Sequence, residues 1–248
     1  MPNYKLLIEY DGRKFEGWQK QKATSNTIQE TIESAISQVL RSPEIRLTGA
    51  GRTDAGVSAY EQAANFSAET EIDTGKFVHS VNSVLPKDIT VLDAVEVSND
   101  FHSRYSAIAR EYSYRCTTKR KSINSDQYYH VRHDPDFDKM QQFIGHVLTL
   151  KNFRTFCKNK DDKHNFACNV INFEITKSCD TEFEFRIIAD RFLHSMVRAL
   201  VGCCLDLSRG RFSLEDIVRA SERGDKINLY FVPPEPLSLI KIHYRNEN

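Results

Sequence analysis

The sequence predicts an α+β fold made of two similar halves. Three observations support this class. Short stretches alternate apolar and polar residues, as strands do, and amphipathic stretches begin at capping residues, as helices do. The third observation is the order in which these two kinds of stretch follow one another along the chain. The order strand–helix–strand–strand–helix–strand occurs twice along the chain. We therefore expect two ferredoxin-like or RRM-like halves, residues 1–107 and 108–248, with mixed, mainly antiparallel sheets joined around a central cleft.

The first half contains three predicted strands, a further extended segment after Glu44, and two predicted helices. Alternation predicts strands over 5–10, 62–66 and 89–97, and amphipathic periodicity predicts helices over 27–41 and 76–85. Thr27 and Glu30 form a capping box at the start of the first helix. Pro86 ends the second helix, because the residue before a proline avoids helical geometry.

The second half repeats this rhythm with four predicted strands and three predicted helices. The strands are expected over 111–117, 170–176, 182–189 and 237–244, and the helices over 137–150, 192–207 and 213–223. The helix over 192–207 is apolar on nearly all sides, which indicates that it is buried between layers. Ser213 and Asp216 cap the last helix, which ends before Gly224.

Composition narrows the class of protein. Lys and Arg together number 34, as do Asp and Glu, so a chain that coats nucleic acid over its whole surface is disfavoured. We see no apolar run long enough to cross a membrane and no signal peptide, and we expect a cytoplasmic protein. None of the six cysteines has metal-ligand spacing, so we expect reduced thiols and no metal.

Two basic segments contain interleaved aromatic residues. Residues 110–121 carry five basic residues and one acidic residue, and residues 151–164 carry five basic and two acidic residues. Tyr112, Tyr114, Phe153 and Phe156 lie within these segments. Most such segments are solvated loops, but cations for phosphates and flat rings for unstacked bases are also what RNA binding requires.

The turn at 51–60, GRTDAGVSAY, places Arg52, Thr53 and Asp54 between glycines. Asp in a turn bracketed by glycine often serves only the turn itself. The alternative is chemistry: an adjacent guanidinium favours the ionised carboxylate, and we then expect a nucleophile rather than a general base. We also expect Gly51 and Gly56 to allow tight backbone geometry.

Two further residues are candidates on chemical grounds. Tyr112 and Tyr114 are two apart on a strand and share one face, while Glu111 and Arg115 take the other. Tyr112 is either a base-stacking residue or a core residue. Arg198 is a charge within an apolar helix, so it either requires an acidic partner or a phosphate, or extends to the surface.

Taken together, the motifs resemble the tRNA pseudouridine synthase A (TruA) family. They occur in order over nearly the whole chain, at 10–12 (YDG), 17–21 (GWQKQ), 27–30 (TIQE), 51–59 (GRTDAGVSA), 62–66 (QAANF), 82–89 (NSVLPKDI), 100–107 (DFHSRYSA), 110–114 (REYSY), 192–202 (FLHSMVRALVG) and 208–210 (SRG). One motif would be weak support, but this many in order make the resemblance specific.

The resemblance implies an isomerase that converts uridine to pseudouridine in the anticodon stem-loop of tRNA, at positions 38 to 40. It implies a homodimer without a cofactor or metal, whose catalytic cleft lies between two α/β halves. Asp54 would be the catalytic nucleophile and Tyr112 would stack on the target base. Arg52 would pair with Asp54 or hold the place of the flipped nucleotide, and we expect Arg198 to lie behind the loop and pair with Asp54.

The sequence departs from the family pattern at four places. Ser58 replaces a usual His, Lys151–Asn152 a usual His-Asp pair, Cys168 a usual Arg, and Pro236 a usual Gly. We expect these changes to affect RNA contacts and the choice of uridine more than the reaction. They also motivate an alternative, a non-catalytic tRNA-binding protein on the same scaffold.

Overall fold

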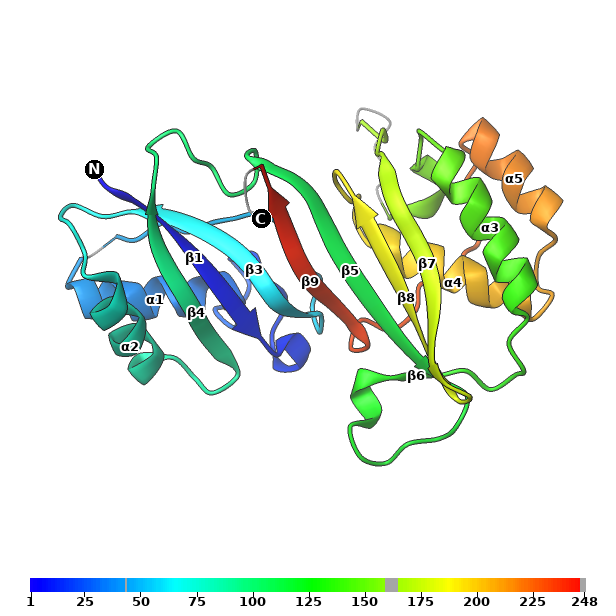
Figure 1. Cartoon of the computed structure of the whole chain (residues 1–248), viewed down its shortest axis with the longest axis horizontal. Helices are drawn as coiled ribbons and strands as arrows, with labels where there is room; N and C mark the ends of the chain where they lie inside the picture. The colour runs from blue at the N-terminus through cyan, green and yellow to red at the C-terminus, as the bar shows by residue number, and fades with distance from the viewer. Residues whose placement is uncertain (43, 159–164, 246–248) are drawn as a thin grey trace. The chain divides into compact units, whose positions relative to one another are not determined.

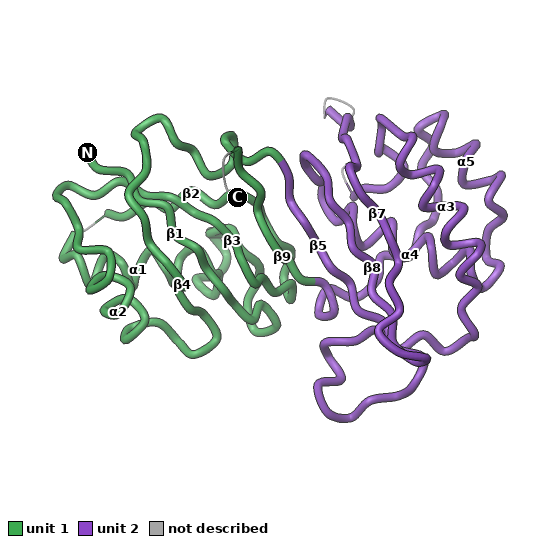
Figure 2. Tube along the Cα trace, viewed as in Figure 1, with its two compact units in different colours: residues 1–108, 238–248 green, residues 109–237 purple. Residues whose placement is uncertain are grey.

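The computed structural model describes residues 1–42, 44–158 and 165–245, and the chain packs as two compact units (Figure 2). Unit 1 comprises residues 1–108 together with 238–248, and unit 2 comprises residues 109–237. The expected division placed 108–248 in one half. The end of the chain lies in unit 1 instead, because strand β9 (Leu237–Tyr244) pairs in parallel with the start of β3 (Ser58–Ser67).

The sheet of unit 1 is mixed. Strand β1 (Asn3–Tyr10) runs antiparallel to both β3 and β4 (Ile89–Val97), and the two-residue strand β2 (Thr48–Gly49) pairs antiparallel with β3. The first four strands and two helices follow in the order β1-α1-β2-β3-α2-β4. This is the expected ferredoxin-like order.

Helices α1 (Ile28–Leu40) and α2 (Thr74–Val84) lie on one face of this sheet (Figure 1). The predicted capping at the start of α1 is confirmed, since the Thr27 side chain accepts a hydrogen bond from the Glu30 N–H at 3.3 Å. Alternate residues of β1 are buried on the helical side together with one face of α1: Tyr4, Leu6, Ile8, Tyr10, Ile28, Ile32 and Ile36.

Unit 2 contains an antiparallel sheet in the order β5-β8-β7. Its strands are β5 (Ala107–Thr117), β7 (Val170–Cys179) and β8 (Glu182–Ala189), with the short strand β6 (Tyr129–His130) parallel to β5. Helix α3 (Phe137–Thr149) packs on β7 and on α4 (Met196–Ser208), and α5 (Leu214–Arg223) packs on α3 (Figure 1). The predicted α+β class with mainly antiparallel strands is confirmed.

Helix α4 starts later than its sequence pattern suggests. Ser195 has left-handed backbone geometry with φ of 56°, and the Met196 N–H donates to the Leu193 carbonyl at 3.0 Å, so a turn precedes the helix, which begins at Met196. Every residue of α4 except Arg198 is buried, in agreement with the prediction. Within the residues that the structure describes, every helix is too short or too polar to cross a membrane.

One pH dependence of stability follows from the packing of α3 on α5. His146 Nε2 lies 2.8 Å from the Ser221 hydroxyl, and burial lowers the pKa of His146, partly opposed by Glu222. A histidine whose pKa is lowered by folding resists protonation in the folded state. The stability that neutral His146 contributes is therefore lost as the pH falls through about 6.5, the pKa of histidine in the unfolded chain.

We predict that His146→Gln, which keeps a hydrogen-bonding group for Ser221, narrows the loss of Tm between pH 7.5 and pH 5.5 relative to the unaltered chain. Thermal unfolding at both pH values measures this. His79→Gln, at an exposed position of α2, controls for removal of an imidazole. A Tm difference between His146→Gln and the unaltered chain that stays constant with pH would contradict the prediction.

Candidate active site

Asp54 lies on a loop of unit 1, residues 51–57, that follows β2 and leads into β3; we call it the Asp54 loop. Asp54 is half-buried, and its carbonyl accepts a hydrogen bond from the Val57 N–H at 3.2 Å. This closes a turn in which Gly56 has φ of 83°. The expected glycine geometry therefore holds for Gly56, whereas the φ of Gly51 is not positive.

The loop after β1, residues 12–18, packs against the Asp54 loop through its backbone. The Trp18 N–H donates to the Thr53 carbonyl at 3.1 Å, and the Gly56 N–H donates to the Phe15 carbonyl at 3.3 Å. Gly17 has φ of 92°, and a Cβ there would lie 2.8 Å from the Thr53 carbonyl oxygen. Only glycine permits this approach without moving the loop.

The sheet supports the other side of the Asp54 loop. The Tyr10 hydroxyl lies 2.8 Å from Thr53 Oγ1, and Gln62 Nε2 donates to the Gly51 carbonyl at 3.1 Å. Burial raises the pKa of Tyr10 to about 12, so its hydroxyl stays protonated at neutral pH. Backbone and side-chain hydrogen bonds thus hold the loop from two directions.

A second polar network ties the segment after Trp18 to helix α1. Gln19 Nε2 donates to Gln29 Oε1 at 2.7 Å, and Gln29 Nε2 donates to Glu33 Oε1 at 2.9 Å. Glu33 Oε1 also accepts from the Leu47 N–H at 2.9 Å. Periodicity along the chain does not reveal this network; the one sequence signal for it is the joint presence of the GWQKQ and TIQE motifs.

Arg52 does not form the expected ion pair. It is exposed, and its side chain makes no hydrogen bond or ion pair with any residue in the described ranges. Arg52 therefore does not hold the Asp54 carboxylate in this structure. The alternative expectation, that Arg52 holds the place of the flipped nucleotide, stays a prediction.

Tyr112 lies on β5 in unit 2, opposite Ile187 of β8, and is 7% exposed. Its ring packs edge-on against Phe192 with centroids 5.1 Å apart. Tyr114 is fully buried, and burial raises its pKa. Glu111, which is expected on the other face of the strand, forms an ion pair with Arg186, with 3.4 Å between Oε1 and Nη1. Strand β5 pairs with β8 in a regular register from Arg110 to Thr117, so the two tyrosines share a face as predicted.

Arg198 is the half-buried residue of the otherwise buried helix α4. Its Nε donates to the Val232 carbonyl at 2.7 Å. One of its five N–H donors therefore serves the protein backbone, which orients the guanidinium. Arg52 and Asp54 belong to unit 1, whereas Tyr112 and Arg198 belong to unit 2.

Residues that depart from the family pattern have local partners. Ser58 Oγ accepts from the Gly12 N–H at 3.1 Å. Lys151 Nζ donates to Asn169 Oδ1 at 2.8 Å, and Asn152 Oδ1 accepts from the Arg154 N–H at 3.0 Å.

Cys168 is buried, and its thiol donates to the Arg191 carbonyl at 2.7 Å. Burial raises the pKa of this thiol to about 12, which keeps it protonated. Residues 159–164 of the second basic segment lie outside the described residues. Across the residues that are described, no group of three or more His, Cys, Asp or Glu side chains could hold a metal ion.

Comparison with known proteins identifies the family. The family model for tRNA pseudouridine synthases matches residues 6–106 and 140–245, which include Asp54 and Arg198. A tRNA pseudouridine synthase A of Leptospira biflexa serovar Patoc is 34% identical over 252 residues, covering 99% of this chain and 95% of the relative. Another, of Caldicellulosiruptor bescii, is 37% identical over 247 residues, covering 98% and 100%. The chain therefore belongs to the tRNA pseudouridine synthase family.

Proposed function

We propose that this protein isomerises uridine to pseudouridine in the anticodon stem-loop of tRNA, at positions 38 to 40, with Asp54 as the nucleophile. The observation that carries the proposal is a half-buried carboxylate on a loop held from two sides by hydrogen bonds, in a chain of this family. A fixed, partly desolvated carboxylate is suited to attack a nucleoside.

The reaction determines what the protein must supply. The N1–C1′ bond of uridine breaks, the uracil turns, and a C5–C1′ bond forms, while C5 loses its hydrogen and N1 gains one. The product is an isomer, so no oxidant and no second substrate are needed. Asp54 acts by attacking the nucleoside or by starting an elimination, and both routes require the same fixed carboxylate.

Each remaining candidate has a role in this proposal. Tyr112 stacks on the target base, which returns about 1–3 kcal/mol of the few kcal/mol needed to unstack it. Arg198 pairs with the Asp54 carboxylate, and Arg52 holds the place of the flipped nucleotide.

The proposed substrate is a polyanion, and the basic segments supply the matching charge. Lys119 and Arg120 are exposed at the end of β5, where they are available for phosphates of the tRNA backbone. We propose that the protein acts in the cytoplasm as a homodimer and needs no cofactor. Light scattering of the purified chain measures the oligomeric state.

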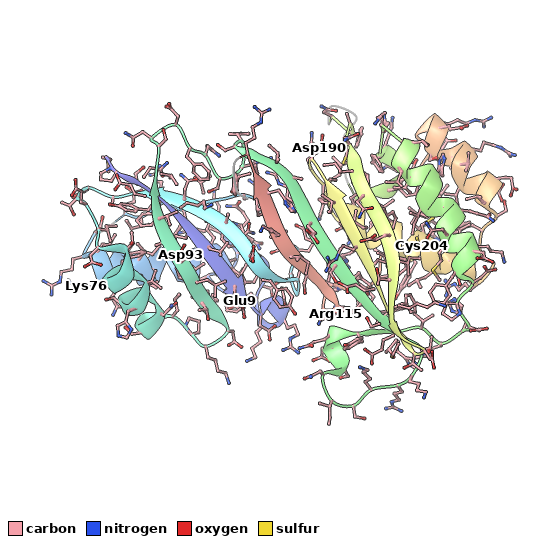
Figure 3. All side chains as sticks on the ribbon, in the orientation of Figure 1. Glu9, Lys76, Asp93, Arg115, Asp190 and Cys204 are labelled. Atoms are coloured by element: carbon pink, nitrogen blue, oxygen red, sulfur yellow. The ribbon has the colours of Figure 1, made fainter. Side chains whose placement is uncertain are left out.

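The first prediction is that Asp54→Asn lowers kcat by about 1,000-fold or more while tRNA binding changes little, because it removes the nucleophile and keeps the shape. Tritium release from tRNA that contains C5-tritiated uridine measures the reaction, and filter binding measures Kd. Asp93→Asn, on the exposed side of β4 (Figure 3), is the matched control. Normal tritium release by Asp54→Asn would show that Asp54 is not the nucleophile.

The same experiment distinguishes the proposed reaction from the alternative function, tRNA binding without catalysis. A non-catalytic tRNA-binding protein would bind tRNA tightly and release no tritium even without a substitution. In that case Asp54→Asn and Asp93→Asn would be indistinguishable in both assays.

The second prediction concerns the geometry of the Asp54 loop. Gly17→Ala places a Cβ 2.8 Å from the Thr53 carbonyl oxygen and enforces φ of 92° on alanine. We expect kcat to fall by about tenfold or more, because small displacements of a catalytic group are costly, and stability to fall by about 1–2 kcal/mol.

Gly75→Ala is the control for the Gly17 substitution. Gly75 lies in α2 of the same unit, and its added Cβ would meet only Asp73 Oδ1, at 3.7 Å. We expect Gly75→Ala to retain full activity and to be about 0.5–1 kcal/mol more stable, as alanine is in helices. Equal kcat values for Gly17→Ala and the unaltered chain would show that the approach of the two loops is irrelevant to the reaction.

A further inference from the structure

Three polar side chains meet in the core of unit 1, and one of them, Thr53, belongs to the Asp54 loop itself. Tyr10 is 3% exposed, Thr53 7% and Gln62 fully buried. The Tyr10 hydroxyl lies 2.8 Å from Thr53 Oγ1, and Gln62 Nε2 lies 3.5 Å from the same hydroxyl. Apolar residues lie next to them: the centroids of the Trp18 and Tyr10 rings lie 5.9 Å apart, and Ile8, which pairs with Gln62 in the sheet, is buried.

This network is not explained by stability alone. Gln62 Oε1 is buried and has no hydrogen-bond partner among the described residues. Burying a polar atom without a partner destabilises the folded state, and an apolar residue of similar shape would avoid that cost. The network therefore retains an unfavourable group in the core, next to the residue that carries the chemistry.

The hydrogen bonds of the network reach the residues on both sides of Arg52, the backbone of Gly51 and the side chain of Thr53. Gln62 Nε2 holds the Gly51 carbonyl at 3.1 Å, and Tyr10 holds the Thr53 side chain. From the opposite side, the Trp18 N–H holds the Thr53 carbonyl. Thr53 is thus fixed through its side chain and its carbonyl, which determines the direction in which the chain enters Asp54.

We propose that Tyr10 and Gln62 are positioning residues: they hold residues 51–53 so that the Asp54 carboxylate points at the nucleoside, and they do not touch the substrate. The inference rests on the proposed function of Asp54. Because both side chains are buried, they act on the reaction only through the residues of the Asp54 loop that they hold, Gly51 and Thr53. The expected signature is a loss in kcat with an unchanged KM.

The chain provides a matched control for Tyr10. Tyr4 lies on the same strand and the same face as Tyr10, is 1% exposed, and its hydroxyl accepts a hydrogen bond from the Ile72 N–H at 2.9 Å. Tyr4→Phe and Tyr10→Phe therefore each delete one buried hydroxyl with one close partner. The two substitutions differ in where the lost partner lies. The partner of Tyr4 lies in the segment before α2, whereas the partner of Tyr10 lies in the Asp54 loop.

We expect Tyr10→Phe to lower kcat by about tenfold or more with an unchanged KM, and Tyr4→Phe to leave kcat unchanged, while both lower Tm to a similar extent. Gln62→Met should reproduce the loss in kcat. Thr53→Val should do so as well, and the double variant Tyr10→Phe/Thr53→Val should lose no more than either single variant, because they remove the same hydrogen bond.

Amide hydrogen exchange supplies a readout that does not depend on activity. Tyr10→Phe should speed exchange in peptides covering residues 50–58, and Tyr4→Phe in peptides covering residues 68–73. Unchanged exchange over 50–58 in Tyr10→Phe, or equal losses of kcat in the two variants, would overturn the positioning role. A wild-type chain that releases no tritium contradicts the proposed function instead, and the exchange comparison then still decides whether the network holds the loop.

Discussion

The close approach of two backbone segments, residues 12–18 and the Asp54 loop, is the constraint on which the candidate site depends. Gly17 and Trp18 serve both the loop and helix α1. The Trp18 N–H donates to Thr53, while the Gly17 and Trp18 carbonyls accept from the Ile28 and Gln29 N–H groups at 3.1 and 3.0 Å. Helix N-termini leave N–H groups without partners inside the helix, and here the loop provides acceptors for two of them. A displacement of this segment would therefore affect α1 and the Asp54 loop together.

Polar side chains extend this coupling into the body of unit 1. Glu33 is only 8% exposed, yet its carboxylate accepts from Gln29 and from the Leu47 N–H, and it lies 3.5 Å from Lys20 Nζ. A buried carboxylate is tolerated when hydrogen bonds and a cation compensate its loss of hydration. The segment that packs against the Asp54 loop is thus itself held by polar contacts, an arrangement that suits the role proposed for the Asp54 carboxylate.

Much of the secondary structure could be predicted because its causes are local. Thr27, Ser213 and Gly224 mark helix ends through contacts within a few residues, and the alternation in β8 reflects its own buried face. The start of α4 was missed because the left-handed backbone at Ser195 has no clear sequence signal. The strands β2 and β6 are two residues long, too short for any periodicity. The unit that β9 joins depends on a pairing between residues about 180 positions apart, which a local pattern does not encode.

By itself, the sequence determined the α+β class, most of the helices and strands, and the family, and with the family the candidacy of Asp54, because ordered motifs survive in the linear chain. Only the tertiary structure decided how Asp54 is held. Tyr10, Thr53 and Gln62 come from different segments, and their hydrogen bonds exist because β1 and β3 lie side by side. It also decided that Arg52 is exposed and makes no ion pair with Asp54, since adjacency along the chain does not bring two side chains together. Side-chain direction follows from backbone geometry and packing, and both are set by residues distant in the sequence.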